Sequence, residues 1–234
     1  MTSSRTGVAP IYNETQSLVD RVTHVVRQSI VDGSLRPGEA VSISDLATDL
    51  GVSHSPVREA IQRLSAQGLI QLRPARTAMV APLKVDDLHD IYRLRKLIEV
   101  DAAVRAAPDL TDKDLKELER QFEIMVQTDI DTDEFWRLHD EFHRGLMRPA
   151  ATDRLTQIVN ELWKAAERYI RVVYSEEGIM RVHSAEERHR PLLEIARTRD
   201  GAAMGKALTE HLESNEAEIS THLAQILDAA AAKA

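Results

Sequence analysis

The sequence predicts a mainly α-helical fold: an N-terminal winged helix-turn-helix, then a C-terminal antiparallel all-α bundle of about six helices. Residues 41–80 contain two amphipathic helical segments joined at Gly51 and followed by two strand-like segments, the order of a helix-turn-helix with a wing. From Val85 onward the apolar residues recur at helical spacing, with no strand-like alternation. Short connections between these later helices favour antiparallel packing.

The helix-turn-helix prediction depends on residues in its turn and its wing. Glycine adopts positive φ without steric cost, so Gly51 suits the turn, and Ser53 suits the N-cap of the second helix. The wing would pair residues 69–72 with 78–80 across the basic tip 73–77. A basic tip beside a helix can contact phosphates and a DNA groove. A small helical bundle with a hairpin is the alternative interpretation.

The chain divides by pattern into four parts: a flexible tail at 1–14, a winged helix-turn-helix at 15–81, a linker at 82–85 and a helical domain at 86–231. The first helix is expected over residues 15–32, ended by Gly33. Its predicted buried face carries Leu18, Val22, Val25, Val26 and Ile30. The helices of the second domain are expected at 86–107, 112–128, 131–147, 151–176, 180–198 and 201–230.

Composition narrows the class of protein. The 234 residues contain no cysteine, which excludes disulfides, thiolate catalysis and Cys-ligated zinc. No apolar run approaches the ~20 residues that span a bilayer, and no signal-peptide pattern is present, so we expect a cytoplasmic protein without a membrane partner. The net charge is +2 over residues 1–84 and −10 over residues 85–234. This asymmetry favours a localised DNA-facing surface over general polyanion binding.

Four histidines in the helical part form a candidate metal site. His139 and His143 are four residues apart, so both lie on one helical face, where two imidazoles can chelate one transition metal. His189 and His211 could add ligands if their helices face this pair. Because histidines at this spacing are more often solvated or hydrogen-bonded, spacing alone leaves both interpretations open.

The N-terminal part resembles the GntR family of bacterial transcription regulators. The matching segments are Gly33–Glu39, Asp45–Ala47, Gly51–Ser53, Pro56–Ala60, Arg63–Leu64, Gly68–Ile70 and Arg73–Pro74, in the family's order and spacing. The resemblance implies a homodimer that binds double-stranded DNA at a pseudo-palindromic operator, with repression the commoner arrangement.

The helical part resembles the FCD effector domain of the FadR subgroup, in its shorter six-helix form. The matching segments are Asp90–Glu99, Phe142–Leu146, His189–Glu194 and Leu208–Leu212. Many FCD domains hold a divalent metal through an Asp and a His four residues apart plus two later histidines. The resemblance places His143, His189 and His211 on the histidine positions, whereas His139 occupies the Asp position.

This departure has chemical consequences. Four neutral imidazoles suit zinc best, with nickel as a second choice, and leave the full charge of the ion to attract an anionic effector such as a small carboxylate. Alternatively, His139 does not bind the ion, which leaves three ligands and a weak or empty site. Arg95 falls on the arginine of the family's R-x-x-L-E motif and could bind the effector carboxylate, although a solvated Arg95–Glu99 pair is an equal alternative. Arg168 and Tyr169 are weaker effector-binding candidates, and Trp136 and Trp163 are expected in the core.

The DNA-contacting residues are expected on the second helix and the wing. Arg58 is the candidate for a base contact, because arginine can bind guanine with two hydrogen bonds. The other candidates, for phosphate, backbone or minor-groove contacts, are Arg36, Ser44, Ser53, His54, Ser55, Arg73, Arg76 and Thr77. Many relatives carry Arg at the position of His54 and Gly at that of Thr77.

Together these features predict a ligand-responsive DNA-binding repressor rather than an enzyme. One alternative is a metal sensor, in which the ion is itself the signal. Another is a metalloenzyme whose histidines activate water, but no HExxH or comparable motif supplies the general base that such an enzyme needs.

Overall fold

The computed structural model describes residues 17–31, 33–73, 77–128, 132–175 and 185–232. The chain forms two compact units. The first contains residues up to Ser29 together with Glu39–Ala81, and the second contains Ile30–Gly38 and the residues from Pro82 onward. The expected tail at 1–14 and the wing residue Arg76 lie outside the described residues.

The winged helix-turn-helix consists of α1 (Leu18–Val31), β1 (Ala40–Val41), α2 (Ile43–Asp49), α3 (His54–Ala66), β2 (Ile70–Arg73) and β3 (Thr77–Val80). The strands form an antiparallel sheet in the order β1-β3-β2. The predicted ribbon of β2 and β3 is confirmed, and Gly51 has the expected positive φ, 63°. The sequence did not reveal β1, since two residues are too few to show an alternating pattern.

The buried face of α1 is narrower than predicted. Val22, Val26 and Ile30 are buried, but Leu18 is 47% exposed and Val25 is 44% exposed. Val22, Val26 and Ile30 are four apart and therefore form one stripe, whereas each single step turns the chain by about 100° and carries Val25 off that stripe. Val31, the last residue of the helix, is also buried. Leu18 is the first residue of the helix, beyond the reach of the core.

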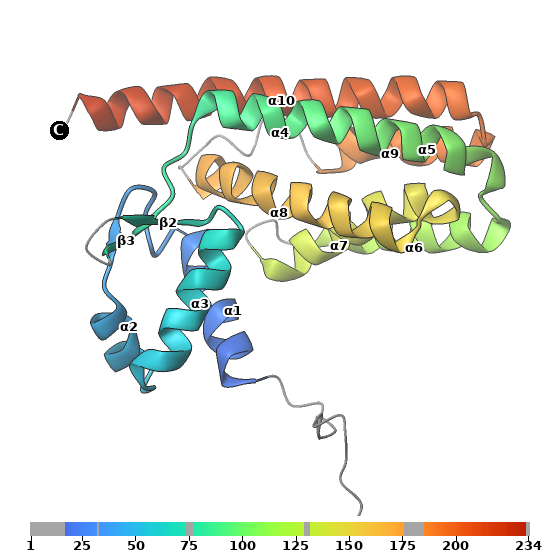
Figure 1. Cartoon of the computed structure of the whole chain (residues 1–234). Helices are drawn as coiled ribbons and strands as arrows, with labels where there is room; N and C mark the ends of the chain where they lie inside the picture. The colour runs from blue at the N-terminus through green and yellow to red at the C-terminus, as the bar shows by residue number, and fades with distance from the viewer. Residues whose placement is uncertain (1–16, 32, 74–76, 129–131, 176–184, 233–234) are drawn as a thin grey trace, which may run out of the picture. The chain divides into compact units, whose positions relative to one another are not determined.

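The second unit is a bundle of long helices. They are α4 (Val85–Arg95), α5 (Asp101–Ala106), α6 (Asp112–Gln127), α7 (Asp133–Met147), α8 (Asp153–Ser175), α9 (Ala185–Thr198) and α10 (Gly201–Ala231). In Figure 1, α10 runs beside α4 and α5, and it contacts both helices. No helix among the described residues is long and apolar enough to cross a membrane.

The helix predicted at 86–107 is interrupted by a π-helical turn. Residues Lys96–Val100 form this turn between α4 and α5. A π turn changes the register of the side chains that follow it, and such turns are frequent at functional sites. Here Glu99 is fully buried and Arg95 is 3% exposed. Apolar periodicity did not predict the turn, because the residues remain helical on both sides of it.

Capping residues set where two bundle helices begin. The backbone N–H of Asp114 donates to Thr111 Oγ1 at 3.2 Å, and the backbone N–H of Thr111 donates to the Asp114 carboxylate at 3.0 Å. This reciprocal capping box fixes the start of α6. Thr132 caps α7 in the simpler way, by accepting from the backbone N–H of Phe135 at 3.2 Å. Both helices therefore start within two residues of their predicted positions.

Candidate functional site

The predicted histidine pair lies on the inward face of α7. His139 and His143 are one turn apart, and their ring centroids are separated by 4.6 Å. His143 is 2% exposed and the side chain of His139 is 14% exposed. Phe135 and Phe142 occupy the same helix and are buried in the core, which fixes the face that α7 turns inward.

Two further helices bring His189 and His211 to this pair. The ring of His189, on α9, has its centroid 5.2 Å from that of His143 and 5.1 Å from that of His139. The ring of His211, on α10, lies 5.1 Å from His143 and 4.9 Å from His189. The structure thus gathers all four histidines singled out from the sequence, and we call them the histidine cluster.

Several ring nitrogens of the histidine cluster are buried without a partner. His143 Nε2, His189 Nε2 and His139 Nδ1 accept or donate no hydrogen bond within the described part of the chain. Donor atoms of these three residues lie within 4.8 Å of one another. A buried polar atom without a partner costs about 1–3 kcal/mol. A divalent cation bound by these nitrogens would remove that cost, so the residues present fit a metal ion.

In two histidines of the cluster, His189 and His211, one ring nitrogen is hydrogen-bonded to the backbone. His189 Nδ1 lies 2.8 Å from the carbonyl oxygen of Ala185, and His211 is hydrogen-bonded to the backbone of Arg188. Such contacts fix the orientation of an imidazole and leave its second nitrogen free, as in metal-ligating histidines. Asp140, the next residue of α7, lies 3.6 Å from His139 Nδ1, too far for a hydrogen bond.

Three members of the histidine cluster, His143, His189 and His211, are electrically neutral at physiological pH. Burial, reinforced by the neighbouring imidazoles, lowers the pKa of His143 and of His189 well below its usual value. Burial likewise lowers the pKa of His211 to about 3. Neutral imidazoles keep their lone pairs available, which metal coordination requires.

Arg95 is next to the histidine cluster but is already paired. Its Nε donates to Glu99 Oε1 at 2.7 Å, and its guanidinium lies 4.8 Å from the centroid of the Tyr92 ring. The Arg95–Glu99 pair anticipated on a solvated face therefore forms in the interior. After burial and the neighbouring imidazoles, the charge of Arg95 further lowers the pKa of His143 and His211, so it adds positive potential at the cluster.

Arg168 and Tyr169 are not at the histidine cluster. Arg168 donates to the carbonyl of Pro82 at 3.3 Å and to the Tyr169 hydroxyl at 3.1 Å, and that hydroxyl donates to Asp87. These contacts attach α8 to the start of α4 and to residue 82. Neither side chain lines the cavity beside the histidines. The contacts therefore indicate a structural role for both residues, different from the effector binding expected of them.

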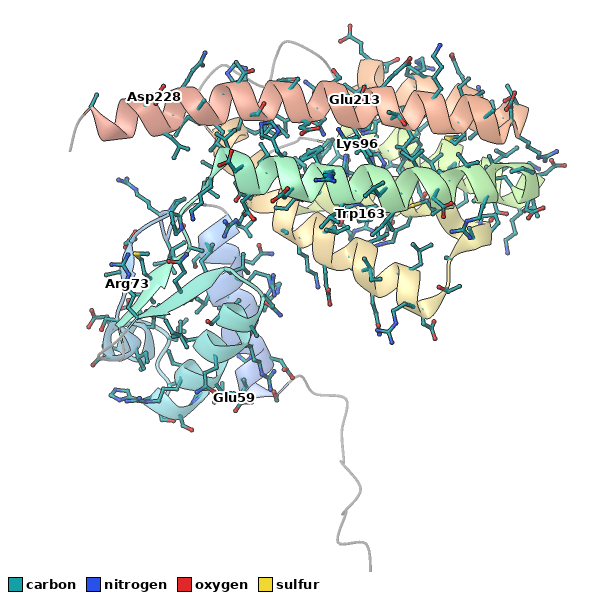
Figure 2. All side chains as sticks on the ribbon, turned by 45° about the horizontal axis from the view of Figure 1, so that its top comes forward. Glu59, Arg73, Lys96, Trp163, Glu213 and Asp228 are labelled. Atoms are coloured by element: carbon teal, nitrogen blue, oxygen red, sulfur yellow. The ribbon has the colours of Figure 1, made fainter. Side chains whose placement is uncertain are left out.

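Most of the expected DNA-contacting residues lie on α2, at the start of α3 or in the sheet, and Arg36 lies between α1 and β1. Arg58 is exposed on α3 beside Glu59, which Figure 2 labels, and Arg73 is exposed at the end of β2. Ser53 occupies the N-cap of α3 but its side chain makes no capping hydrogen bond. The remaining exposed candidates are Arg36, Ser44, His54 and Ser55. Thr77 pairs with Arg73 in the sheet, and Arg76 lies outside the described residues.

Two family models match the chain. The model of the bacterial regulatory proteins of the gntR family matches residues 18–80, and the FCD domain model matches residues 90–214. The chain belongs to the GntR family and carries an FCD domain. It is accordingly a DNA-binding transcription regulator and not an enzyme.

Individual relatives agree with this assignment. The chain is 30% identical over 217 residues to the HTH-type transcriptional repressor RspR of Escherichia coli (strain K12), covering 92% of each chain. Among solved structures, it is similar to a GntR family member from Pseudomonas syringae pv. tomato str. DC3000, with a TM-score of 0.56, 30% identity and coverage of 92% and 91%. E. coli McbR/YncC, at 24% identity, shares the fold with a TM-score of 0.71 and coverage of 89% and 100%.

Within the FCD domain, a cavity of about 30 Å³ lies beside His139, His189 and His211. Among the residues that line it are Trp136, Tyr174, Arg188 and Asn215. Tyr174, Arg188 and Asn215 were not among the site residues expected from the sequence, and Trp136 was expected in the core. A signal was available for two of them. Arg188 directly precedes His189, and Asn215 follows His211 by one helical turn.

Proposed function

We propose that this regulator represses transcription as a homodimer on a pseudo-palindromic operator, and that a small carboxylate held at a metal ion in the FCD domain changes its affinity for DNA. The observation that carries the proposal is the histidine cluster, with its buried, unpartnered ring nitrogens within the described part of the chain. The relative RspR is named a transcriptional repressor, which supports repression as the sign of regulation.

The proposed ligands of the metal are His139, His143, His189 and His211. A set of neutral nitrogen donors favours zinc, with nickel as a second choice, over magnesium or calcium. When bound, the ion would offer a Lewis-acidic position to an anion. With no carboxylate among the four ligands, the charge of the ion stays uncompensated, and the nearby Arg95 adds to the positive potential. Both features favour an anionic effector.

On the DNA side, we propose that Arg58 contacts a base edge. Ser53, His54 and Ser55 would meet phosphates at the N-terminus of α3, where backbone N–H groups are free. Arg36, Ser44, Arg73, Arg76 and Thr77 would contact the backbone or the minor groove. Effector binding would then shift the equilibrium between two placements of the paired winged helices, of which only one fits the operator spacing.

The test uses the full-length protein and an operator selected from a random DNA library. DNA affinity and thermal stability are measured in zinc-loaded and chelator-treated protein against a panel of small carboxylates. We expect one acid class to raise the melting temperature and to weaken DNA binding, in the zinc-loaded protein only, because a ligand that binds the folded state stabilises it by mass action. If carboxylates change the melting temperature and the DNA affinity equally after metal removal, the proposal that a metal ion anchors the effector is wrong.

A metal sensor is the second candidate, and the size of the cavity favours it. About 30 Å³ beside the histidines holds little more than a water molecule. In a metal sensor, removal of the ion alone would release the operator and no carboxylate would have an effect. The same experiment therefore separates the two functions.

A further inference from the structure

Arg188 lies at the edge of the histidine cluster and is bound by an acidic partner. Its Nη2 donates to both carboxylate oxygens of Glu218, at 2.8 and 2.6 Å. Its Nη1 lies 3.3 Å from the Tyr174 hydroxyl and 3.5 Å from Asn215 Oδ1. The side chains of Arg188 and Glu218 are each 18% exposed. The pair is therefore sheltered but can still exchange with solvent.

Two cavities meet at Arg188. The small one contacts His139, His189 and His211, and a larger groove of about 260 Å³ runs between α9 and α10. Arg188, His211 and Asn215 line both of them. These three side chains consequently form the partition between the groove and the histidine cluster. A small molecule that enters by the groove meets the Arg188 guanidinium before it meets the buried imidazoles of His143 and His189.

We propose that Arg188 is the arginine that binds the effector carboxylate, and that Glu218 is the built-in competitor for the same guanidinium. The proposal rests on the proposed function. The effector carboxylate would enter from the α9–α10 groove, take the place of Glu218 on Arg188 and lie beside the metal ion that the histidine cluster would hold. The exchange keeps Arg188 paired and frees Glu218 to face solvent, so no buried charge is left alone.

Arg95, the arginine expected from the sequence, fits this contact less well. It is 3% exposed, is paired with the fully buried Glu99, and lines neither cavity. Releasing Arg95 would leave Glu99 buried without its cation, which is strongly unfavourable. Arg95 thus adds positive electrostatic potential to the site, whereas Arg188 makes the contact with the effector carboxylate. The Tyr174 hydroxyl and the Asn215 amide beside Arg188 can bind further polar atoms of the same compact carboxylate.

The test uses full-length protein loaded with Co²⁺, whose visible spectrum reports changes at the metal, and acetate as the probe carboxylate. Arg188→Gln is expected to raise the Kd for acetate at least tenfold. Glu218→Gln, which removes the competitor but keeps Arg188, is expected to lower that Kd at least threefold. Arg190→Gln is the matched control. It removes an exposed arginine of the same helix that pairs with Glu186, and it should leave the Kd unchanged.

The outcomes separate this inference from the function on which it rests. If the unmodified protein gives no spectrum of bound Co²⁺, the proposed function fails and the inference fails with it. If Co²⁺ binds normally but Arg188→Gln leaves the Kd unchanged, or Glu218→Gln raises it, only the inference fails. A spectrum that acetate does not alter in the unmodified protein or in Glu218→Gln would also overturn the inference alone. An unaltered Co²⁺ spectrum in each variant before acetate is added shows that the fold is intact.

Discussion

His139 and His143 lie one turn apart on α7 with their ring centroids separated by 4.6 Å, and His139 is the more exposed of the two. If both bind the ion, His139→Ala should weaken zinc binding by at least about tenfold, because even the loss of a residue that only hydrogen-bonds to a metal ligand costs roughly tenfold to a hundredfold. His139→Asp should restore much of the affinity, because a carboxylate at this position stands where the FCD pattern has one.

Competition with a chelating dye measures both zinc affinities directly. His24→Ala, which removes an exposed histidine of α1, is the matched control and should bind zinc normally. An unchanged affinity in His139→Ala would show that three histidines suffice and that His139 is not a ligand.

Substitution of Arg58 should weaken DNA binding and leave the stability of the fold unchanged. The side chain is exposed on α3, whereas the helix is anchored by Val57, Ile61 and Leu64, all fully buried. Arg58→Ala is therefore expected to cost about 1–3 kcal/mol of operator affinity and to relax base preference at one position. Fluorescence anisotropy with the selected operator measures the loss. Arg154→Ala, an exposed arginine of α8, is the control, and equal losses in the two variants would refute the assignment.

Local patterns predicted the helices well because their causes are local. The apolar stripe of α3, the glycine turn before it and the threonine caps of α6 and α7 all depend on residues within a few positions of one another. Apolar spacing failed at the π-helical turn Lys96–Val100, since a register change inside a helix leaves both flanking patterns intact. It also failed at β1, whose two residues are ordered by pairing with β3.

The candidate site was predictable only in part. The spacing of His139 and His143 on one helix indicated a pair, and family resemblance supplied the two histidines from other helices. The position of Arg188 depends on how α9 packs against α10, and no local pattern reports that packing. In the same way, Arg168 and Tyr169 have suitable chemistry for an effector, but tertiary packing directs them to Pro82 and Asp87.

Gly201 permits a close approach between α10 and the segment around Val104. A Cβ atom at Gly201 would lie 2.5 Å from the backbone oxygen of Val104, whereas one at Gly205 would lie 2.6 Å from the side-chain atom Val104 Cγ2. Because backbone moves less readily than a side chain, Gly201→Ala should lower the free energy of unfolding by about 1–3 kcal/mol, and Gly205→Ala by less. Urea denaturation measures both. A Gly201→Ala variant as stable as the unmodified protein would show that α10 can shift without cost.

Glu216, on α10, is hydrogen-bonded to His89 on α4 and to Lys96 at the start of the π-helical turn. Its carboxylate accepts from Lys96 Nζ at 2.8 Å and from His89 Nδ1 at 2.7 Å, and Figure 2 shows Lys96 between the two helices. Burial opposes the charge of Glu216, but these hydrogen bonds outweigh it and hold the pKa of the carboxyl below its usual value. Since His89 and Lys96 are partly exposed, Glu216→Gln should cost about 1 kcal/mol of stability at neutral pH.

The pH dependence of that loss follows from the lowered pKa of Glu216. A carboxyl whose folded pKa is depressed stabilises the fold fully above its unfolded pKa, near 4.5. This contribution disappears as the pH falls through the lower folded pKa. Urea denaturation should therefore show the unmodified protein to be more stable than Glu216→Gln from pH 7 to about pH 5, with a difference that shrinks at more acidic pH. Glu213→Gln, an exposed glutamate on the same helix, should show no such difference. If the loss in Glu216→Gln stays undiminished in acid, its cause is packing and not the charge of the carboxylate.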